Sequence, residues 1–234
     1  MVKDVFMKRS EINNVIKKFE ALLDKYNFSL PPFCNWSKEE WESKTAEYDE
    51  IRDNQLGWDI TDFGLNKFEK IGFSLITLRN GNQTDDRYKK PYAEKLLMLF
   101  ENQKAPMHYH SFKCEDIINR GGGTIIISVY NANKKDRSLS ESDVLINTDG
   151  RSYSAKAGTK VYLKPGESIT IWPYQYHDFA VEKGSGDVLI GEVSMCNDDV
   201  NDNFFLEPIG RFPKVEEDEK PYRLLCSEYP KFKG

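Results

Sequence analysis

Apolar side chains recur every three or four positions near the start of the chain, over residues 10–26. This spacing predicts an amphipathic helix with one apolar stripe, made of Ile12, Val15, Ile16, Phe19, Leu22 and Leu23. Ser10 is the expected N-cap, and two consecutive prolines end the helical segment. A second short helix is expected to begin at Ser37, because Glu40 completes a capping box with it. This helix would turn Trp41 inward.

The pattern changes after about residue 55, where short apolar runs alternate with turn residues. The runs are rich in Ile, Val, Leu and aromatic residues and are bounded by Gly, Asn, Asp or Pro, which is typical of strands. Their spacing predicts an antiparallel sandwich or barrel. The predicted strands lie within residues 73–81, 94–103, 123–131, 142–150, 159–166, 168–173, 177–184 and 187–194. Of these, 94–103 also fits a helical turn.

The domain organisation follows from this change of pattern. No repeat or linker divides the 234 residues, and that length suits one large domain. We therefore predict a single all-β-dominated domain, residues 1–234. It would have a helical N-terminal arm (1–55), a barrel (56–200) and a C-terminal extension (201–234) that packs on the barrel.

Charge and composition indicate which kinds of partner and which cellular compartment to expect. The formal net charge of −5 gives no electrostatic reason to expect nucleic acid or an anionic membrane surface. No apolar run is long enough for a transmembrane helix, and the first residues lack the apolar core of a signal peptide. Four scattered cysteines without a Cys-x-x-Cys motif are typical of reduced thiols in a cytoplasmic protein.

The three histidines of the chain are its main chemical signal. His108 and His110 lie two residues apart, so on a strand they share one face and can clamp one metal ion. Glu115 would join them if a bulge or turn intervened, and His177 would supply a third imidazole. A lone His-x-His pair is more often an ordinary surface or hydrogen-bonded pair, but the combination favours a metal site.

Three imidazoles and one carboxylate suit a borderline-to-hard divalent ion such as Mn²⁺, Fe²⁺, Co²⁺, Ni²⁺ or Zn²⁺. On an octahedral ion, four protein ligands leave two positions. Two adjacent open positions suit a small ligand that chelates through neighbouring oxygens, such as a 1,2-hydroxycarbonyl compound.

The same residues resemble those of a known superfamily. The first metal-binding motif of the cupins is matched in spacing by His108, His110, Glu115 and Gly122. Gly166 and His177 match the second motif, although Trp172 and Tyr174 replace its usual Pro and Gly. Those two departures concern the shape of the turn more than the identity of the ligands.

Further segments make the resemblance more specific and extend it over nearly the whole chain. They are residues 8–13, 30–33, 56–64, 79–81, 90–97, 115–123, 165–169, 191–199, 202–203, 211–213, 216–219 and 228–230. Together they resemble the D-lyxose isomerase family. The resemblance implies a cupin β-barrel of jelly-roll type and the interconversion of D-lyxose with D-xylulose, with D-mannose and D-fructose as a related pair. It also implies Mn²⁺ as the metal.

Aldose–ketose isomerisation moves a hydrogen between the first two sugar carbons. A divalent ion that holds both oxygens would stabilise an enediolate while a base transfers the proton. A metal-assisted hydride shift is the alternative. Lys113 is the expected helper that contacts the substrate and a developing oxyanion, unless it is a solvated lysine at the barrel rim. Glu192 is expected to be the base or to orient a ligand histidine, and Asp199 is a second candidate base.

Two further groups of polar residues are candidates for the site. Asp198 and Arg211 are the expected substrate binders, because their side chains form paired hydrogen bonds with hydroxyl groups. Glu217 belongs to an acidic run that is usually a solvated face, and it is expected to close over the site as a catalytic carboxylate.

Three rival functions stay open at this point. A phosphosugar isomerase would need clustered Arg or Lys for the phosphate, and only Lys113 and Arg211 qualify. An Fe²⁺-dependent cupin oxygenase would use the same ligands, and a non-catalytic sugar-binding or structural cupin would keep the metal without turnover. By analogy with cupins, we expect a homodimer with the helical arm near the interface.

Overall fold

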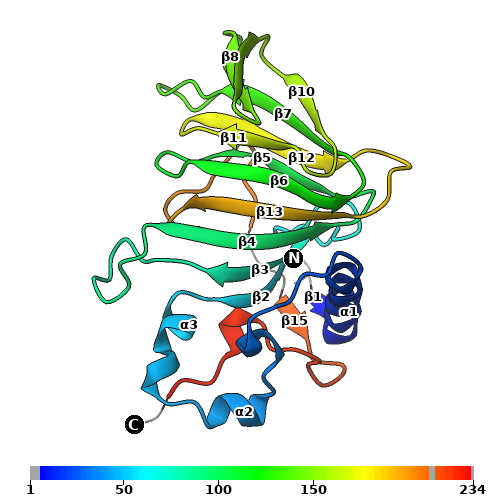
Figure 1. Cartoon of the computed structure of the whole chain (residues 1–234), viewed down its shortest axis with the longest axis vertical. Helices are drawn as coiled ribbons and strands as arrows, with labels where there is room; N and C mark the ends of the chain where they lie inside the picture. Colours follow the sequence, from blue (N-terminus) through cyan, green and yellow to red (C-terminus); the bar gives the residue numbers. More distant parts are fainter. Residues whose placement is uncertain (1–5, 211–213, 233–234) are drawn as a thin grey trace, which may run out of the picture.

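Two antiparallel sheets dominate the fold, as the computed structural model shows for residues 6–210 and 214–232 (Figure 1). The larger sheet runs in the order β2 (Gly57–Thr61), β3 (Phe73–Arg79), β4 (Tyr92–Leu99), β13 (Val188–Met195), β6 (Glu115–Gly122), β11 (Ser168–Ile171), β8 (Val144–Thr148) and β9 (Arg151–Ala155). The smaller sheet runs in the order β10 (Thr159–Leu163), β7 (Ile125–Asn131), β12 (Gln175–Val181), β5 (Lys104–Tyr109) and β14 (Phe204–Phe205).

The β-dominated, cupin-like fold is confirmed, but its closure as a barrel is not. Within the described residues, the edge strands β2 and β9 of the larger sheet pair with neither β10 nor β14 of the smaller sheet. The fold is therefore an open two-layer sandwich. The larger sheet has more strands than the smaller one can cover, so the two sheets do not meet along both edges.

The helices lie at one end of the sandwich (Figure 1). They are α1 (Arg9–Lys25), α2 (Lys38–Glu42) and α3 (Asp49–Asp53), with 3₁₀ turns at Pro32–Asn35, Ala46–Tyr48 and Cys226–Glu228. The expected N-cap of the first helix was wrong. Lys8 is the N-cap, with the Glu11 carboxylate accepting its amide, because the chain enters the helix directly from β1 (Phe6–Lys8), which pairs in parallel with β15 (Lys214–Glu216).

The second helix begins as predicted. Ser37 and Glu40 form the capping box at its start, with each side chain bound to the backbone amide of the other residue. Trp41 is turned inward and is only 1% exposed. It stacks on Tyr229 at a ring-centroid distance of 4.0 Å, so this helix and the C-terminal segment share one aromatic contact.

The surroundings of β4 explain why residues 94–103 fitted both a strand and a helical turn. Leu97 and Leu99 face the smaller sheet and belong to the core between the two layers. Leu96 and Met98 face the other way, against the apolar stripe of α1. A strand that is covered on both faces has no alternation of apolar and polar residues, so the run of leucines also fitted a helical turn.

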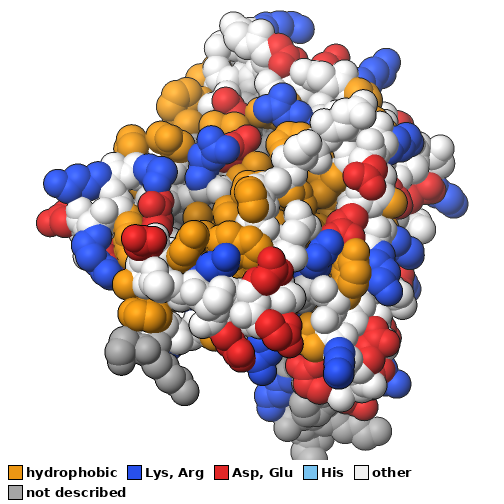
Figure 2. Space-filling view, turned by 60° about the horizontal axis from the view of Figure 1, so that its bottom comes forward, with side chains coloured by type: hydrophobic (Ala, Val, Ile, Leu, Met, Phe, Trp, Pro, Cys, Tyr) orange, Lys and Arg blue, Asp and Glu red, His pale blue; other side chains and the backbone are white. Residues whose placement is uncertain are grey.

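The surface of the molecule has mixed charge on the face shown in Figure 2. Lys and Arg side chains lie among Asp and Glu side chains there, around a central group of hydrophobic ones, and no continuous basic area is visible among the residues drawn in colour. None of the helices in the described part of the chain combines the length and apolarity that crossing a membrane requires.

Candidate metal centre and active site

The two sheets bring the predicted ligands together from opposite sides. His108 on β5 is directly paired with His177 on β12, so both imidazoles leave the same face of the smaller sheet. Glu115 begins β6 in the larger sheet. The expected turn between His110 and Glu115 is therefore a crossing from one sheet to the other, which points the carboxylate back toward the histidines.

The geometry of these four residues fits a bound cation. One ligand atom from each of His108, His110, Glu115 and His177 lies within 4.8 Å of all the others. Nε2 of His110 and Nε2 of His177 are fully buried and have no hydrogen-bond partner among the described residues, although Glu115 Oε1 lies 3.5 and 2.9 Å away. Buried polar nitrogens are rarely left unsatisfied without a reason. A metal ion would give both nitrogens a partner.

Each imidazole is oriented through its other ring nitrogen. Nδ1 of His108 lies 2.8 Å from the Pro106 carbonyl, and Nδ1 of His177 lies 3.2 Å from the Gln175 carbonyl. Nδ1 of His110 lies 2.5 Å from the carbonyl of Asp202. A carbonyl accepts only from a protonated Nδ1, which leaves Nε2 with the lone pair that a metal needs.

Electrostatics favour the ligand forms at two of these positions. Burial, together with the neighbouring imidazoles, lowers the pKa of His108 well below its ordinary value, so the ring is neutral. Burial alone would raise the pKa of Glu115, but the adjacent Lys113 ammonium and the histidines hold it well below the ordinary value. The carboxylate is therefore charged and available as a ligand.

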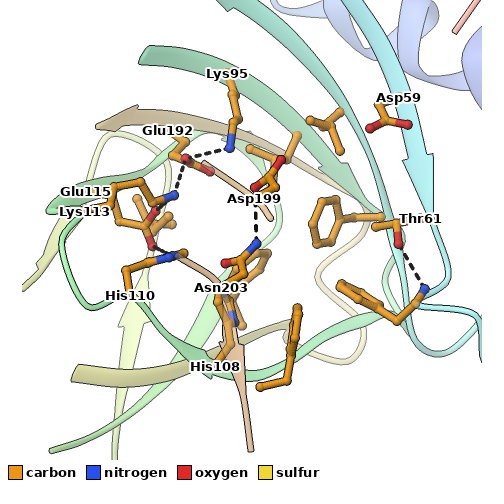
Figure 3. A pocket seen from close by; sticks show the side chains of 17 residues that line it. Asp59, Thr61, Lys95, His108, His110, Lys113, Glu115, Glu192, Asp199 and Asn203 are labelled. Carbon is orange, nitrogen blue, oxygen red and sulfur yellow. Dashed lines mark hydrogen bonds and ion pairs between the residues drawn. The ribbon is translucent and has the colours of Figure 1, made fainter. Parts of the chain in front are cut away.

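A cluster of buried charges adjoins the ligands (Figure 3). Nζ of Lys113 lies 2.6 Å from Oε2 of Glu115 and 3.1 Å from Oε1 of Glu192. Nζ of Lys95 lies 3.2 Å from the same Glu192 oxygen, and both lysines donate to the side-chain oxygen of Asn197. Burial opposes the charge of Lys113, but Glu115 and Glu192 outweigh it and raise the pKa of Lys113 above its ordinary value.

Three of the ligands and the charge cluster line one cavity that also has aromatic rings in its lining (Figure 3). Its polar lining residues outside the ligand set include Asp59, Thr61, Lys95, Glu192, Asp199 and Asn203. Its aromatic lining residues are Phe63, Phe73, Phe179 and Phe205. Asn203 donates a 3.2 Å hydrogen bond to Asp199. A cavity lined by both polar groups and aromatic rings suits a small molecule that has both hydroxyl groups and C–H faces.

The structure brings together most of the predicted site residues. The four ligands, Lys113, Glu192 and Asp199 all border the same cavity or meet at its metal end. Asp198 does not line this cavity, and its carboxylate accepts bonds from Val200 and Asn201 in its own turn. Glu217 is bound to Arg9 of α1, 2.6 Å away. Arg211 lies outside the described residues.

Sequence reasoning missed several polar residues that line the cavity. Lys95 carries the clearest signal, because it occupies an inward position of β4 whose next inward neighbours are the core residues Leu97 and Leu99. A charged residue in such a position needs buried partners. Asn203 carries no comparable signal, since Asn is common beside turns, and Asp59 lies within β2, which is not among the predicted strands.

Comparison with known proteins connects this geometry to a family. The sequence profile described as D-lyxose isomerase matches residues 7–229. The chain belongs to the D-lyxose isomerase family. It is 44% identical to the D-lyxose/D-mannose isomerase of Serratia proteamaculans, over 97% of this chain and 99% of that protein. It is 43% identical to the protein of the same name from Escherichia coli O157:H7, over 97% and 100% of the two chains. The protein is thus a sugar isomerase.

Solved structures of other sugar isomerases share the fold. The L-ribose isomerase of Acinetobacter sp. DL28, in complex with L-ribose, superposes with a TM-score of 0.61 at 12% identity, covering 91% of this chain and 99% of that one. The L-ribose isomerase of Cellulomonas parahominis gives 0.60 at 14% identity, covering 92% and 100%. At such low identity the likeness concerns the fold alone, so the chemistry of this D-lyxose isomerase family member rests on its own residues.

Proposed function

We propose that this protein is a metal-dependent aldose–ketose isomerase that interconverts D-lyxose and D-xylulose, and D-mannose and D-fructose. The observation that carries the proposal is the convergence of three imidazoles and Glu115 beside two buried lysines and Glu192. The relatives named D-lyxose/D-mannose isomerase support the substrate pairs. Mn²⁺ is the proposed ion, with Co²⁺, Zn²⁺, Fe²⁺ and Ni²⁺ as alternatives that the same ligands accept.

His108, His110, His177 and Glu115 would hold the ion, which would supply positive charge next to the oxygens on the first two carbons of the sugar. The residues around it would manage the protons. Glu192 is the first candidate to take the proton from the second carbon and return it to the first, because it lines the cavity next to Glu115. Asp199 is the second candidate for this role.

Lys113 is proposed to stabilise the negative charge that develops on the sugar oxygen. Its ammonium is buried and lies between Glu115 and Glu192, so it reaches both the ligand set and the candidate base. A fixed, water-excluded cation stabilises a developing oxyanion much better than a solvated one does. Asp198 and Arg211 remain proposed substrate binders, although Asp198 lies in a neighbouring pocket and Arg211 is outside the described residues.

The polar residues of the lining suggest how the sugar lies in the cavity. With its first two carbons at the histidines, the rest of the chain would extend toward Asp59 and Thr61, which Figure 3 shows on the side away from His108 and His110. The hydroxyl groups would then contact the polar side chains, and the C–H groups would contact the phenylalanines. A pentose and a hexose would differ only at this distal end.

The rival functions are less well supported by the same residues. A phosphosugar isomerase needs cations that are available to a phosphate group. The two lysines that line the cavity already contact carboxylates. An Fe²⁺-dependent oxygenase would use the same ligands but would not need two buried lysines and a second buried carboxylate.

Cytoplasmic location and a homodimer stay part of the proposal. No disulfide joins the four cysteines in the described part of the chain, which is compatible with a reducing compartment. The homodimer rests on analogy with other cupins.

The decisive experiment measures D-xylulose formed from D-lyxose by protein stripped with EDTA, with and without added Mn²⁺. Turnover that returns only with the metal supports the proposal. Stoichiometric metal binding without turnover of aldopentoses or aldohexoses contradicts it, and phosphosugars and O₂ consumption would then be tested. In D₂O, deuterium incorporated into the product identifies proton transfer, whereas its absence favours a hydride shift.

A further inference from the structure

The turn between β5 and β6, residues 111–114, connects the two halves of the ligand set. His110 precedes it, Glu115 follows it, and Lys113 lies within it. It also carries the chain from the smaller sheet to the larger one. A turn in this position sets the distance between three functional side chains, so something must fix its backbone.

One buried carboxylate binds the turn at three successive residues. Oδ1 of Asp202 accepts the backbone amide of Ser111 at 2.7 Å, the Ser111 hydroxyl at 2.7 Å and the backbone amide of Phe112 at 3.0 Å. Oδ2 of Asp202 accepts the backbone amide of Lys113 at 2.8 Å. Successive amides that point at one place form a concave site for an anion, and here the anion is a side chain of the same protein that is only 6% exposed.

The backbone of Asp202 acts on the ligand set as well. Its carbonyl lies 2.5 Å from Nδ1 of His110 and so fixes the plane of that imidazole. The segment that carries Asp202 is itself held, because the Asp202 amide donates to the Asp198 carbonyl and β14 pairs with β5 from Phe204 onward. One residue therefore contacts a ligand through its backbone and the adjoining turn through its side chain.

We propose that Asp202 is a positioning residue of the metal centre, whose carboxylate sets the turn so that His110, Lys113 and Glu115 converge. The inference rests on the proposed metal-dependent function and adds to it a residue that touches neither metal nor sugar. A carboxylate is required because all four side-chain bonds are donated to it. An asparagine has one acceptor oxygen, and its amide group would face a backbone N–H donor.

The test compares Asp202→Asn with Asp149→Asn as a matched control. The Asp149 carboxylate likewise accepts the amide and hydroxyl of one serine, Ser168, but at a turn away from the ligands. Ser111→Ala is a milder variant that removes a single hydroxyl bond. Calorimetric titration of each metal-free protein with Mn²⁺ below its melting temperature gives Kd. The visible spectrum of the Co²⁺-loaded protein reports the ligand geometry.

We expect Asp202→Asn to raise the Kd for Mn²⁺ about tenfold, as is usual when a partner that orients a ligand is lost, and to alter the Co²⁺ spectrum. Ser111→Ala should shift Kd in the same direction by about twofold, and Asp149→Asn should leave Kd and spectrum unchanged. If Asp202→Asn does not fold, Ser111→Ala and its spectrum decide.

Three results would overturn the inference. In the first, the Asp202 variant has a lower melting temperature but an unchanged Kd and spectrum, which is the behaviour of a merely structural residue. In the second, the Asp202 variant does not fold, and Ser111→Ala changes neither the Kd for Mn²⁺ nor the Co²⁺ spectrum. In the third, the wild-type protein binds no Mn²⁺. Only that third result removes the proposed metal site too, so failure of the positioning role and failure of the function are distinguishable.

Discussion

The interior of the sandwich has two ends that are built on the same strands. At one end the inward side chains are apolar, as with Ile190 on β13 and Leu97 on β4, which are 0% and 2% exposed. Two residues along the same faces, Glu192 and Lys95 are also buried but charged. The strands do not change at that point, but the chemistry of their inward residues does.

The two ends of the interior differ in what their inward residues contribute to stability. Apolar inward residues contribute burial, which favours folding. Charged inward residues cost desolvation, which only close partners offset. The lysines, glutamates and histidines at the second end therefore lower stability relative to a fully apolar core, a cost that the proposed reaction explains.

The largest expected effect is the loss of a ligand at the charged end. His177→Ala removes one of the four proposed ligands and should lower kcat/KM for D-lyxose by more than about 10³-fold, because the proposed ion would lose affinity and position. Metal content by mass spectrometry should fall in parallel. Asp178→Asn, at the next position of β12 and on the opposite face, should keep both within about twofold. An active His177 variant with full metal content would contradict the site.

The next largest effect is expected at Glu192, and it distinguishes a general base from a carboxylate without a role in proton transfer. Glu192→Gln keeps the shape of the side chain but removes its basicity, so kcat should fall by roughly 10²–10⁴-fold, the usual contribution of a general base, with metal content retained. Glu94→Gln is the matched control. It makes the same change on β4 opposite Val193, where Glu94 pairs with Arg79 on the outward face. A fall confined to Asp199→Asn would transfer the role of base to that residue.

The third prediction concerns the apolar end of the same strand. Ile190→Ala leaves a cavity in the core between the sheets and should lower the free energy of unfolding by about 2–5 kcal/mol. Because Ile190 belongs to the apolar core and is not among the residues that line the cavity, kcat at a temperature below unfolding should change less than about twofold. Denaturant titration and steady-state kinetics measure the two quantities. A large loss of kcat in the still-folded variant would mean that the two ends are not independent.

The same contrast explains what could be predicted from sequence. Strands β3, β4, β7, β8 and β10 to β13 were visible because apolar runs alternate with turn residues, but β2, β5, β6, β9 and β14 were not among the predicted runs. The proposed ligands were visible because histidine is rare here and its spacing is specific. Lys95 is a charge within an apolar run, which is a signal that was missed, because β4 is covered on both faces and its pattern does not tell which side chains point inward. Open sheet edges and the crossing of residues 111–114 between sheets depend on pairings distant in sequence, which no local pattern encodes.

The smallest effect on kcat is expected at Glu217, which the sequence suggested as a catalytic carboxylate. As a catalytic carboxylate that closes over the site, it would lower kcat strongly when changed to Gln. The structure instead places it against Arg9, with its side chain 56% exposed. Arg9 keeps a second carboxylate partner in Glu228. We therefore expect Glu217→Gln to leave kcat within about twofold. A tenfold loss would show that Glu217 reaches the sugar during turnover.

The difference in unfolding free energy between wild type and Glu217→Gln should depend weakly on pH and should decrease in acid. The hydrogen bond from Arg9 lowers the pKa of Glu217 below its ordinary value of 4.5. A carboxyl with a depressed pKa in the folded state stabilises the protein above its unfolded pKa and loses that contribution as pH falls through the folded pKa. Water screens the exposed Glu217 carboxylate, so the free energy of unfolding of wild type should exceed that of Glu217→Gln by no more than about 0.5 kcal/mol at pH 7. Urea titrations should show the gap closing below pH 4.5. A gap that widens in acid would mean that another group holds the tail to α1.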